Sequence, residues 1–182
     1  MNGNDAQKLT PNLRGLSHIH LNPAEISIST KPILVSTILG SCVSLTFFHA
    51  KTNTAAICHG MLPNAPNHSD QAPEPNQKNC FRYVDCAVNF IIGQLREKHV
   101  PLKELHIKMF GGSEMFIQGE KDIVQSEWKE SVGQKNIAAA KACIKKSGLT
   151  IRATDVGGLR GRKIFFYTDT GEVLLRRLYN GL

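Results

Sequence analysis

A cysteine and a histidine are the two residues of this sequence that are best placed to do chemistry. Cys42 comes just after Gly40, at the end of an apolar, β-branched run over residues 33–38. A strand that ends in a tight glycine turn presents Ser41 and Cys42 at its end, with backbone N–H groups free near the thiol. A thiol held in this way, beside donors for a negatively charged oxygen, has the setting of a cysteine nucleophile.

His59 is the candidate base for this thiol. Two apolar runs, at residues 43–48 and 55–62, flank a polar turn. If they pair as a β-hairpin, the end of the second run returns beside the start of the first, and Cys42 and His59 become neighbours. A base within hydrogen-bond reach is the minimum for an activated thiol. Each residue alone has a plainer explanation, since a cysteine beside apolar strands is usually a small buried hydrophobe and a lone histidine is usually structural.

Length and composition predict one globular domain with a substantial core. The chain has 182 residues, of which 41% are hydrophobic and 20% are charged. We expect residues 1–20 to be a flexible N-terminal arm and residues 21–182 to form the single domain. No stretch reaches the length of a membrane span, and the polar N-terminus lacks the features of a signal peptide. We therefore expect a cytoplasmic protein without membrane insertion.

The cysteines and the charge exclude other classes of function. The five cysteines are odd in number and irregular in spacing, which argues against a disulfide framework, and no C-x-x-C pair indicates a zinc site. We expect no metal and no cofactor. The net charge of +7 is scattered, which is weak evidence for an acidic partner. No nucleic-acid-binding motif is present, so we expect no nucleic-acid partner.

Hydropathy patterns predict seven or so strands and two helices. Helical spacing predicts helices over residues 81–98 and 136–146, and alternation predicts hairpins at both ends of the domain. Mixed β-sheets with helices on the outer faces follow, which is an α+β layered sandwich. A polar loop with three prolines, residues 64–79, starts shortly after the candidate base, and we expect it to be mobile and to shape access to the site.

Short motifs along the chain resemble one known family. They stand in the family's order over about residues 25–178, at 39–43 (LGSCV), 59–63 (HGMLP), 83–87, 108–112 (KMFGG), 133–136 (GQKN), 155–158 (DVGG) and 161–163 (GRK). Together they resemble the chemoreceptor glutamine deamidases called CheD. The resemblance implies a fold similar to the catalytic domain of cytotoxic necrotising factor toxins.

The resemblance implies a cysteine hydrolase that converts receptor glutamines to glutamates through a thioester, with Cys42 as nucleophile and His59 as base. A hydroxyl residue upstream completes the family's triad. An alignment with the family motif without gaps puts Ser36 at this position, and Thr37 lies beside it. Their side chains point to opposite faces of a strand. We favour Ser36, with Thr37 as the substitute if the glycine turn shifts the register.

The resemblance also suggests substrate contacts and partners. The oxyanion would form near the turn, and paired glycines would let the backbone approach the substrate, with tight turns as an equal alternative. The candidate substrate-binding residues are Gly40, Ser41, Gly111, Gly112, Gly157 and Gly158. Methyl-accepting chemotaxis receptors are the implied partners. A CheC-type phosphatase is a further partner in the family, and a regulatory binding module for it is the alternative function. A side esterase activity on receptor methyl esters would use the same thioester.

Overall fold

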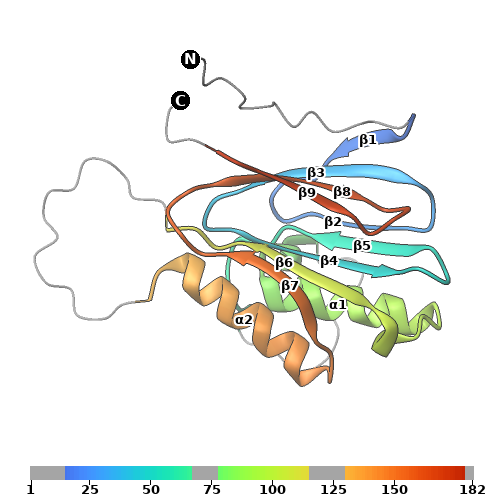
Figure 1. The fold of residues 1–182 in the computed structure, drawn as a ribbon. Helices are drawn as coiled ribbons and strands as arrows, with labels where there is room; N and C mark the ends of the chain where they lie inside the picture. The colour runs from blue at the N-terminus through green and yellow to red at the C-terminus, as the bar shows by residue number, and fades with distance from the viewer. Residues whose placement is uncertain (1–14, 67–77, 115–129, 179–182) are drawn as a thin grey trace, which may run out of the picture.

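The computed structural model describes residues 15–66, 78–114 and 130–178, and the structural statements below concern these residues. They form a mixed α+β fold, drawn in Figure 1. The strands are β1 (Ser17–His20), β2 (Ile26–Ser29), β3 (Ile33–Leu39), β4 (Val43–His49), β5 (Thr54–Cys58), β6 (His106–Gly111), β7 (Ile151–Val156), β8 (Arg162–Tyr167) and β9 (Val173–Arg177). The helices are α1 (Val84–Glu97) and α2 (Val132–Lys146), with short 3₁₀ segments η1 (Lys78–Arg82) and η2 (Leu102–Glu104).

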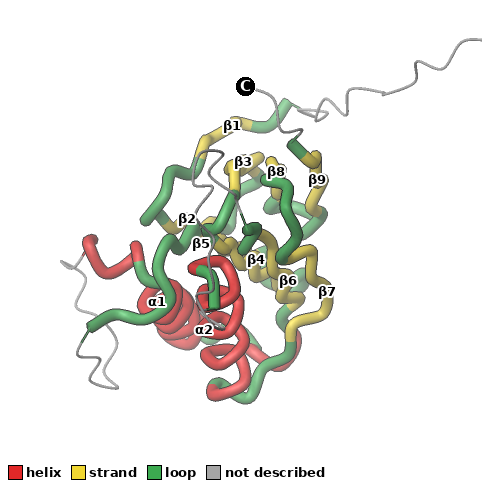
Figure 2. Tube along the Cα trace, turned by 90° about the vertical axis from the view of Figure 1, so that its left-hand side faces the viewer, coloured by secondary structure: helices red, strands yellow, loops and turns green. Residues whose placement is uncertain are grey.

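Two sheets are stacked, and both α-helices cover the outer face of one of them. The four-stranded sheet has the order β1-β3-β8-β9, and the five-stranded sheet has the order β2-β5-β4-β6-β7. Each contains parallel and antiparallel pairs. Figure 2 shows the layers end-on, with the helices against the five-stranded sheet. The predicted layered sandwich of mixed sheets is confirmed, while the likeness to the toxin domain stays a prediction.

Strand β4 lies at the centre of the sandwich and is buried along its whole length. Alternate side chains of a strand point to opposite faces. Val43, Leu45 and Phe47 therefore pack with the helices, while Phe48 packs in the cluster between the two sheets. The inter-sheet cluster also contains Val35 and residues of β8. Cys42, the candidate nucleophile, directly precedes this central strand.

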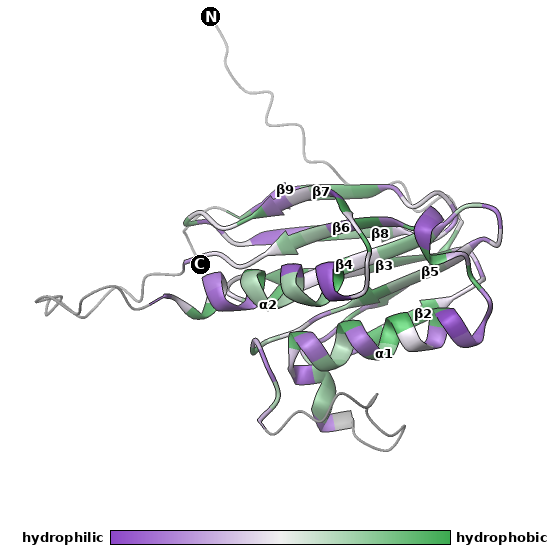
Figure 3. Cartoon of the chain, turned by 90° about the horizontal axis from the view of Figure 1, so that it is seen from below, coloured by the Kyte–Doolittle hydropathy of each residue, from purple (hydrophilic) through white to green (hydrophobic). Residues whose placement is uncertain are grey.

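The two predicted helices are confirmed, with small shifts at their ends. Most apolar residues of α1 and α2 pack in the core cluster with the five-stranded sheet. Figure 3 shows that hydrophobic and hydrophilic residues alternate along both helices. Helix α2 begins four residues before the predicted start because Ser131 and Gln134 form a reciprocal capping box there. No helix in the described parts of the chain is both long enough and apolar enough to cross a membrane.

Two sequence expectations concern segments that are only partly described. Of the predicted N-terminal arm, Ser17–His20 forms strand β1, which pairs in parallel with β3. Residues 1–14 lie outside the described residues, as do residues 67–77 of the predicted mobile loop. The mobility of that loop stays a prediction.

The expectation that the cysteines form no disulfide framework needs a correction. Cys80 and Cys86 are joined by a disulfide. Cys80 lies in η1 and Cys86 in the first turn of α1, so the chain folds back within six residues and brings the two Cα atoms to 5.7 Å. That separation is typical of disulfides. The six-residue spacing crosses a helix start and matches no disulfide pattern that we could recognise in the sequence.

Several strand ends meet at one end of the sandwich. Leu39 at the end of β3 pairs with the first residue of β8, and Val43 at the start of β4 pairs with the last residue of β6. Val43 also bridges to Gly60, just beyond β5. The turn between β3 and β4 therefore lies where segments of both sheets come together.

A glycine in the last hairpin supports the packing of β4. Gly171 has φ +70°, and a Cβ there would lie 2.3 Å from the Phe48 ring. We expect Gly171→Ala to lower the free energy of unfolding by about 2–4 kcal/mol, from backbone strain plus overpacking. Gly148→Ala is the matched control, because Gly148 has φ +69° with open space around it, and should cost only about 1 kcal/mol. Denaturant titration measures both, and equal losses would contradict the packing argument.

Candidate active site

The β4–β5 hairpin brings Cys42 and His59 to the same face of the five-stranded sheet. The pairing is antiparallel, and its register extends to Val43 and Gly60, which exchange two backbone hydrogen bonds of 2.9 Å. In this register Ser44 stands opposite His59, so Cys42 and His59 are diagonal neighbours on one face. Cys42 is half-buried against the inter-sheet cluster. The predicted hairpin is confirmed.

Thr37 holds the His59 ring from the other sheet. Thr37 Oγ1 lies 2.8 Å from His59 Nδ1 and 2.8 Å from the Leu21 carbonyl oxygen. A hydroxyl has one proton, and the carbonyl can only accept. Both contacts are therefore hydrogen bonds only if Thr37 donates to Leu21 and accepts from the N–H of His59 Nδ1. These two hydrogen bonds place the ring proton on Nδ1 and leave the lone pair on Nε2. His59 Nε2 is buried and has no hydrogen-bond partner among the described residues.

The preference for Ser36 as the hydroxyl that faces His59 is wrong. Ser36 lies on the outer face of the four-stranded sheet, where its Oγ is 2.8 Å from His18 Nε2 and 3.5 Å from His20 Nδ1. The regular part of β3 ends at Leu39, and the glycine turn that follows breaks the alternation counted back from Cys42. Thr37, the substitute, is the residue that contacts His59.

Burial keeps the cysteine and the histidine in their neutral forms. It raises the pKa of the Cys42 thiol, although the residue's own backbone N–H lowers it. It lowers the pKa of His59 to about 4, against smaller opposing effects of the Leu21 carbonyl and the Glu25 carboxylate. At neutral pH the pair is therefore a thiol beside a neutral imidazole, and His59 is free to accept a proton.

The nucleophile turn, residues 40–42, is tied down through all three of its carbonyl oxygens. The Gly40 oxygen accepts from the Ser113 backbone N–H (2.8 Å), and the Cys42 oxygen accepts from the Gly112 backbone N–H (2.7 Å). The Ser41 oxygen accepts from the Asn136 side-chain amide (2.9 Å). Within the described residues, the backbone N–H groups of the turn donate to no acceptor on another residue. Such fixed, unused donors beside a thiol can stabilise a developing oxyanion.

Gly111 and Gly112 are close to other parts of the protein. A Cβ on Gly111 would lie 2.1 Å from the Cys42 carbonyl oxygen, and one on Gly112 would lie 2.6 Å from the Ile137 side chain. These glycines let β6 approach the nucleophile turn without a clash. Their predicted contact with substrate stays a prediction.

Gly157 and Gly158 form a turn beside this segment. Both have positive φ, and a Cβ on either would meet open space. Hydrogen bonds from Gly157 N to Gly111 O (2.9 Å) and from Glu114 N to Gly158 O (2.8 Å) fasten the turn to the end of β6. The arrangement fits the tight-turn alternative, and a substrate contact at these residues is untested.

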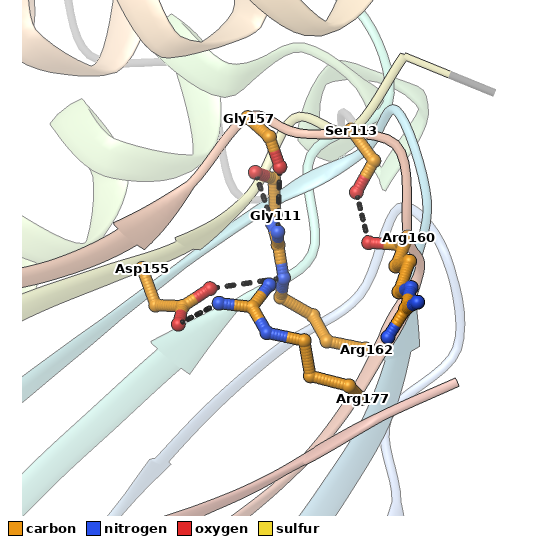
Figure 4. Close-up of polar contacts among 7 residues, drawn as sticks. All are labelled: Gly111, Ser113, Asp155, Gly157, Arg160, Arg162 and Arg177. Carbon is orange, nitrogen blue, oxygen red and sulfur yellow. Dashed lines mark hydrogen bonds and ion pairs between the residues drawn. The ribbon is translucent and has the colours of Figure 1, made fainter. Parts of the chain in front are cut away.

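A buried arginine, Arg162, binds the backbone of Gly111 and Gly157, as Figure 4 shows. Arg162 is fully buried and donates to the carbonyl oxygens of Gly111 and Gly157. Its Nε lies 3.2 Å from Asp155 Oδ1, and Arg177 pairs with the other oxygen of Asp155 at 2.7 Å. The guanidinium therefore joins the end of β6 to the residue that follows β7, and the neighbouring Gly112 N–H donates to the Cys42 carbonyl oxygen of the nucleophile turn.

Sequence reasoning missed Asn136 and Arg162 as parts of the site. Both stand in motifs that carried the family resemblance, at residues 133–136 and 161–163, but no chemistry was assigned to them. Their positions in the motifs could have raised the question of a role. The carbonyl oxygens that they bind near the turn belong to the backbone and leave no trace in a sequence.

Comparisons with known proteins point to one family. The profile of a family described as "CheD chemotactic sensory transduction" matches residues 61–177. A "Probable chemoreceptor glutamine deamidase CheD 2" of Geobacter sulfurreducens is 40% identical, over 90% of this chain and 91% of its own. Proteins named "Probable chemoreceptor glutamine deamidase CheD" are 36% identical in Nitratidesulfovibrio vulgaris (90% and 78% covered) and 32% identical in Pseudomonas syringae pv. tomato (89% and 90% covered).

The low pKa of His59 makes stability depend on pH. Its folded-state pKa of about 4 lies below the ordinary 6.5, so the unfolded chain binds the proton more tightly. Neutral His59 therefore contributes about 3 kcal/mol to the free energy of unfolding. This contribution is complete above pH 6.5 and is lost as the pH falls toward 4. We expect His59→Gln to remove this component, which denaturant titrations of both proteins between pH 7 and pH 4 would measure. Parallel losses in both proteins would contradict the assignment.

Proposed function

The chain belongs to the CheD family, and we propose that it hydrolyses specific glutamine side-chain amides of methyl-accepting chemotaxis receptors to glutamates. The observation that carries the proposal is the hydrogen-bonded Thr37–His59 pair, with the free His59 Nε2 on the same face as Cys42. The names of the relatives supply the substrate class. Receptor fragments incubated with the protein should gain about one dalton per converted glutamine, because NH₂ is replaced by OH.

The first half of the reaction forms a thioester. His59 Nε2 takes the thiol proton as the sulfur of Cys42 attacks the amide carbon, because the resting pair is neutral. The negative charge that develops on the amide oxygen is stabilised by backbone N–H groups of residues 40–42. His59 then gives its proton to the leaving nitrogen, and ammonia departs as the carbon–nitrogen bond breaks.

The second half releases glutamate. His59 accepts a proton from water, the water oxygen attacks the thioester carbon, and the carbon–sulfur bond breaks with return of the proton to the sulfur. Throughout, the bond from His59 Nδ1 to Thr37 stabilises the positive charge that the ring acquires. Glutamyl methyl esters would reach the same thioester by loss of methanol, so a side esterase activity follows from the same residues.

We place the reaction in the cytoplasm, as the family resemblance implies. The free thiol of Cys42 suits a reducing compartment, whereas the Cys80–Cys86 disulfide is not typical of one. A CheC-type phosphatase stays a proposed further partner. The catalytic proposal and the binding-module alternative differ in whether they need the thiol.

Replacing the thiol tests the nucleophile. We expect Cys42→Ser to lower the rate of deamidation about a thousandfold or more, because a hydroxyl is far less acidic and His59 alone cannot activate it. The melting temperature should hardly change. Mass spectrometry of receptor fragments measures the rate. Substantial residual deamidation would refute the role of Cys42, and an unchanged cellular effect would favour the binding module.

Replacing the two hydroxyls separately tests the third position. Thr37→Val keeps the shape but removes the bond to His59 Nδ1, and should lower kcat about tenfold to a hundredfold. Ser36→Ala, on the opposite face of the same strand, is the matched control and should stay within about twofold of the parent. Steady-state kinetics measures both. Equal, small effects would mean that a different group orients His59.

A further inference from the structure

We propose that Asn136 is a positioning residue, which holds the nucleophile turn and the segment after the base at a fixed separation. This inference rests on the proposed function. Asn136 is fully buried in helix α2, on the far side of the five-stranded sheet from Thr37. Its side-chain amide reaches the strand ends where residues 40–42 and His59 lie, so it joins three elements that are distant in the sequence.

Both donors of the Asn136 amide are used on these two segments. Nδ2 lies 2.9 Å from the Ser41 carbonyl oxygen and 2.9 Å from the Met61 carbonyl oxygen. Ser41 immediately precedes the nucleophile, and Met61 follows the base by two residues. A carbonyl oxygen can only accept a hydrogen bond, so both partners require the NH₂ end of the Asn136 amide. They therefore fix which way the amide is turned. The group acts as a two-pronged clamp between the nucleophile and the base.

The Asn136 side chain makes these two bonds although its own oxygen has no hydrogen-bond partner. Asn136 Oδ1 is buried without a hydrogen-bond partner in the described structure. An unpaired buried acceptor lowers the free energy of unfolding by about 1–3 kcal/mol, so stability alone would not favour an amide at this position. No other side chain of this size supplies two donors from one uncharged atom. The residue type is therefore explained by the two carbonyl oxygens that it binds.

Holding the Ser41 carbonyl also directs the turn. Because that oxygen is drawn toward α2, the next peptide N–H, on Cys42, points to the opposite side, where the thiol lies. The Cys42 backbone N–H indeed lowers the pKa of its own thiol. Loss of the clamp would let the turn rotate, which would move the thiol relative to His59 and misdirect the oxyanion donors.

The test compares Asn136→Asp and Asn136→Ala with Gln134→Ala. Gln134 lies two residues earlier on α2, makes capping bonds to Ser131 and donates to the Glu114 carboxylate (2.7 Å), but contacts neither Ser41 nor Met61. Its loss therefore weakens the start of the helix without removing the bonds to these two carbonyl oxygens. Three quantities are measured on the full chain: kcat and KM on receptor fragments, the melting temperature, and the rate of Cys42 alkylation by iodoacetamide between pH 6 and pH 9, followed by peptide mass spectrometry.

We expect both Asn136 variants to lose kcat about tenfold to a hundredfold with KM nearly unchanged, because a small misplacement of reacting groups has effects of this size. The alkylation rate of Asn136→Asp should fall further behind the parent as the pH rises, since an ionised carboxylate has no donor and disfavours a nearby thiolate. The deficit of Asn136→Ala should not change with pH. Gln134→Ala should lose stability and keep its kcat.

The outcomes separate the inference from the proposed function. Asn136 variants that keep kcat and alkylation within twofold of the parent overturn the clamp. So do losses that follow the melting temperature equally in all three variants. If the parent converts no receptor glutamine while the alkylation pattern is as expected, the clamp stands and the proposed function fails, because alkylation needs no receptor.

Discussion

One hydrogen bond, from His59 Nδ1 to Thr37 Oγ1, crosses from one sheet to the other and makes the site depend on the whole sandwich. Cys42 and His59 adjoin strands of the five-stranded sheet, and Thr37, whose hydroxyl contacts the His59 ring, lies on the four-stranded sheet. The inter-sheet cluster sets the distance between the layers, so it also sets the length of this bond. A loss of packing far from Cys42 would thus reach the chemistry by changing how the imidazole is held.

Two buried polar residues near the nucleophile turn, Arg162 and Asn136, bind the protein backbone. Arg162 and Asn136 are fully buried and donate to carbonyl oxygens of the segments that surround the turn. A buried charge is stable only with close partners, and Arg162 has two carbonyl oxygens and Asp155. Side chains that grip backbone can hold a turn whose own side chains must stay available for reaction.

The sequence revealed those parts of the fold and the site that depend on local patterns. Alternation along residues 43–48 and 55–62 was enough to predict the hairpin, and the hairpin was enough to bring His59 near Cys42. The choice between Ser36 and Thr37 depended on where β3 ends and on which face packs against the other sheet. Both depend on tertiary structure. Counting alternate residues back from Cys42 could not reveal them, because the alternation is broken at the Gly40 turn. The roles of Asn136 and Arg162 were not predicted, because the backbone carbonyls that they bind have no sequence signature.

The neutral resting state of Cys42 and His59 bears on selectivity. A preformed thiolate would react with many electrophiles, whereas a thiol whose pKa is raised by burial reacts slowly until a base and an oxyanion site act together. His59 can take the proton only if its ring accepts a positive charge in a site that lowers its pKa to about 4. That cost is offset when negative charge develops at the substrate oxygen beside the N–H groups of the turn. In the proposed mechanism, an amide seated in the turn therefore makes the thiol more reactive than it is in the free protein, which favours substrates that fit.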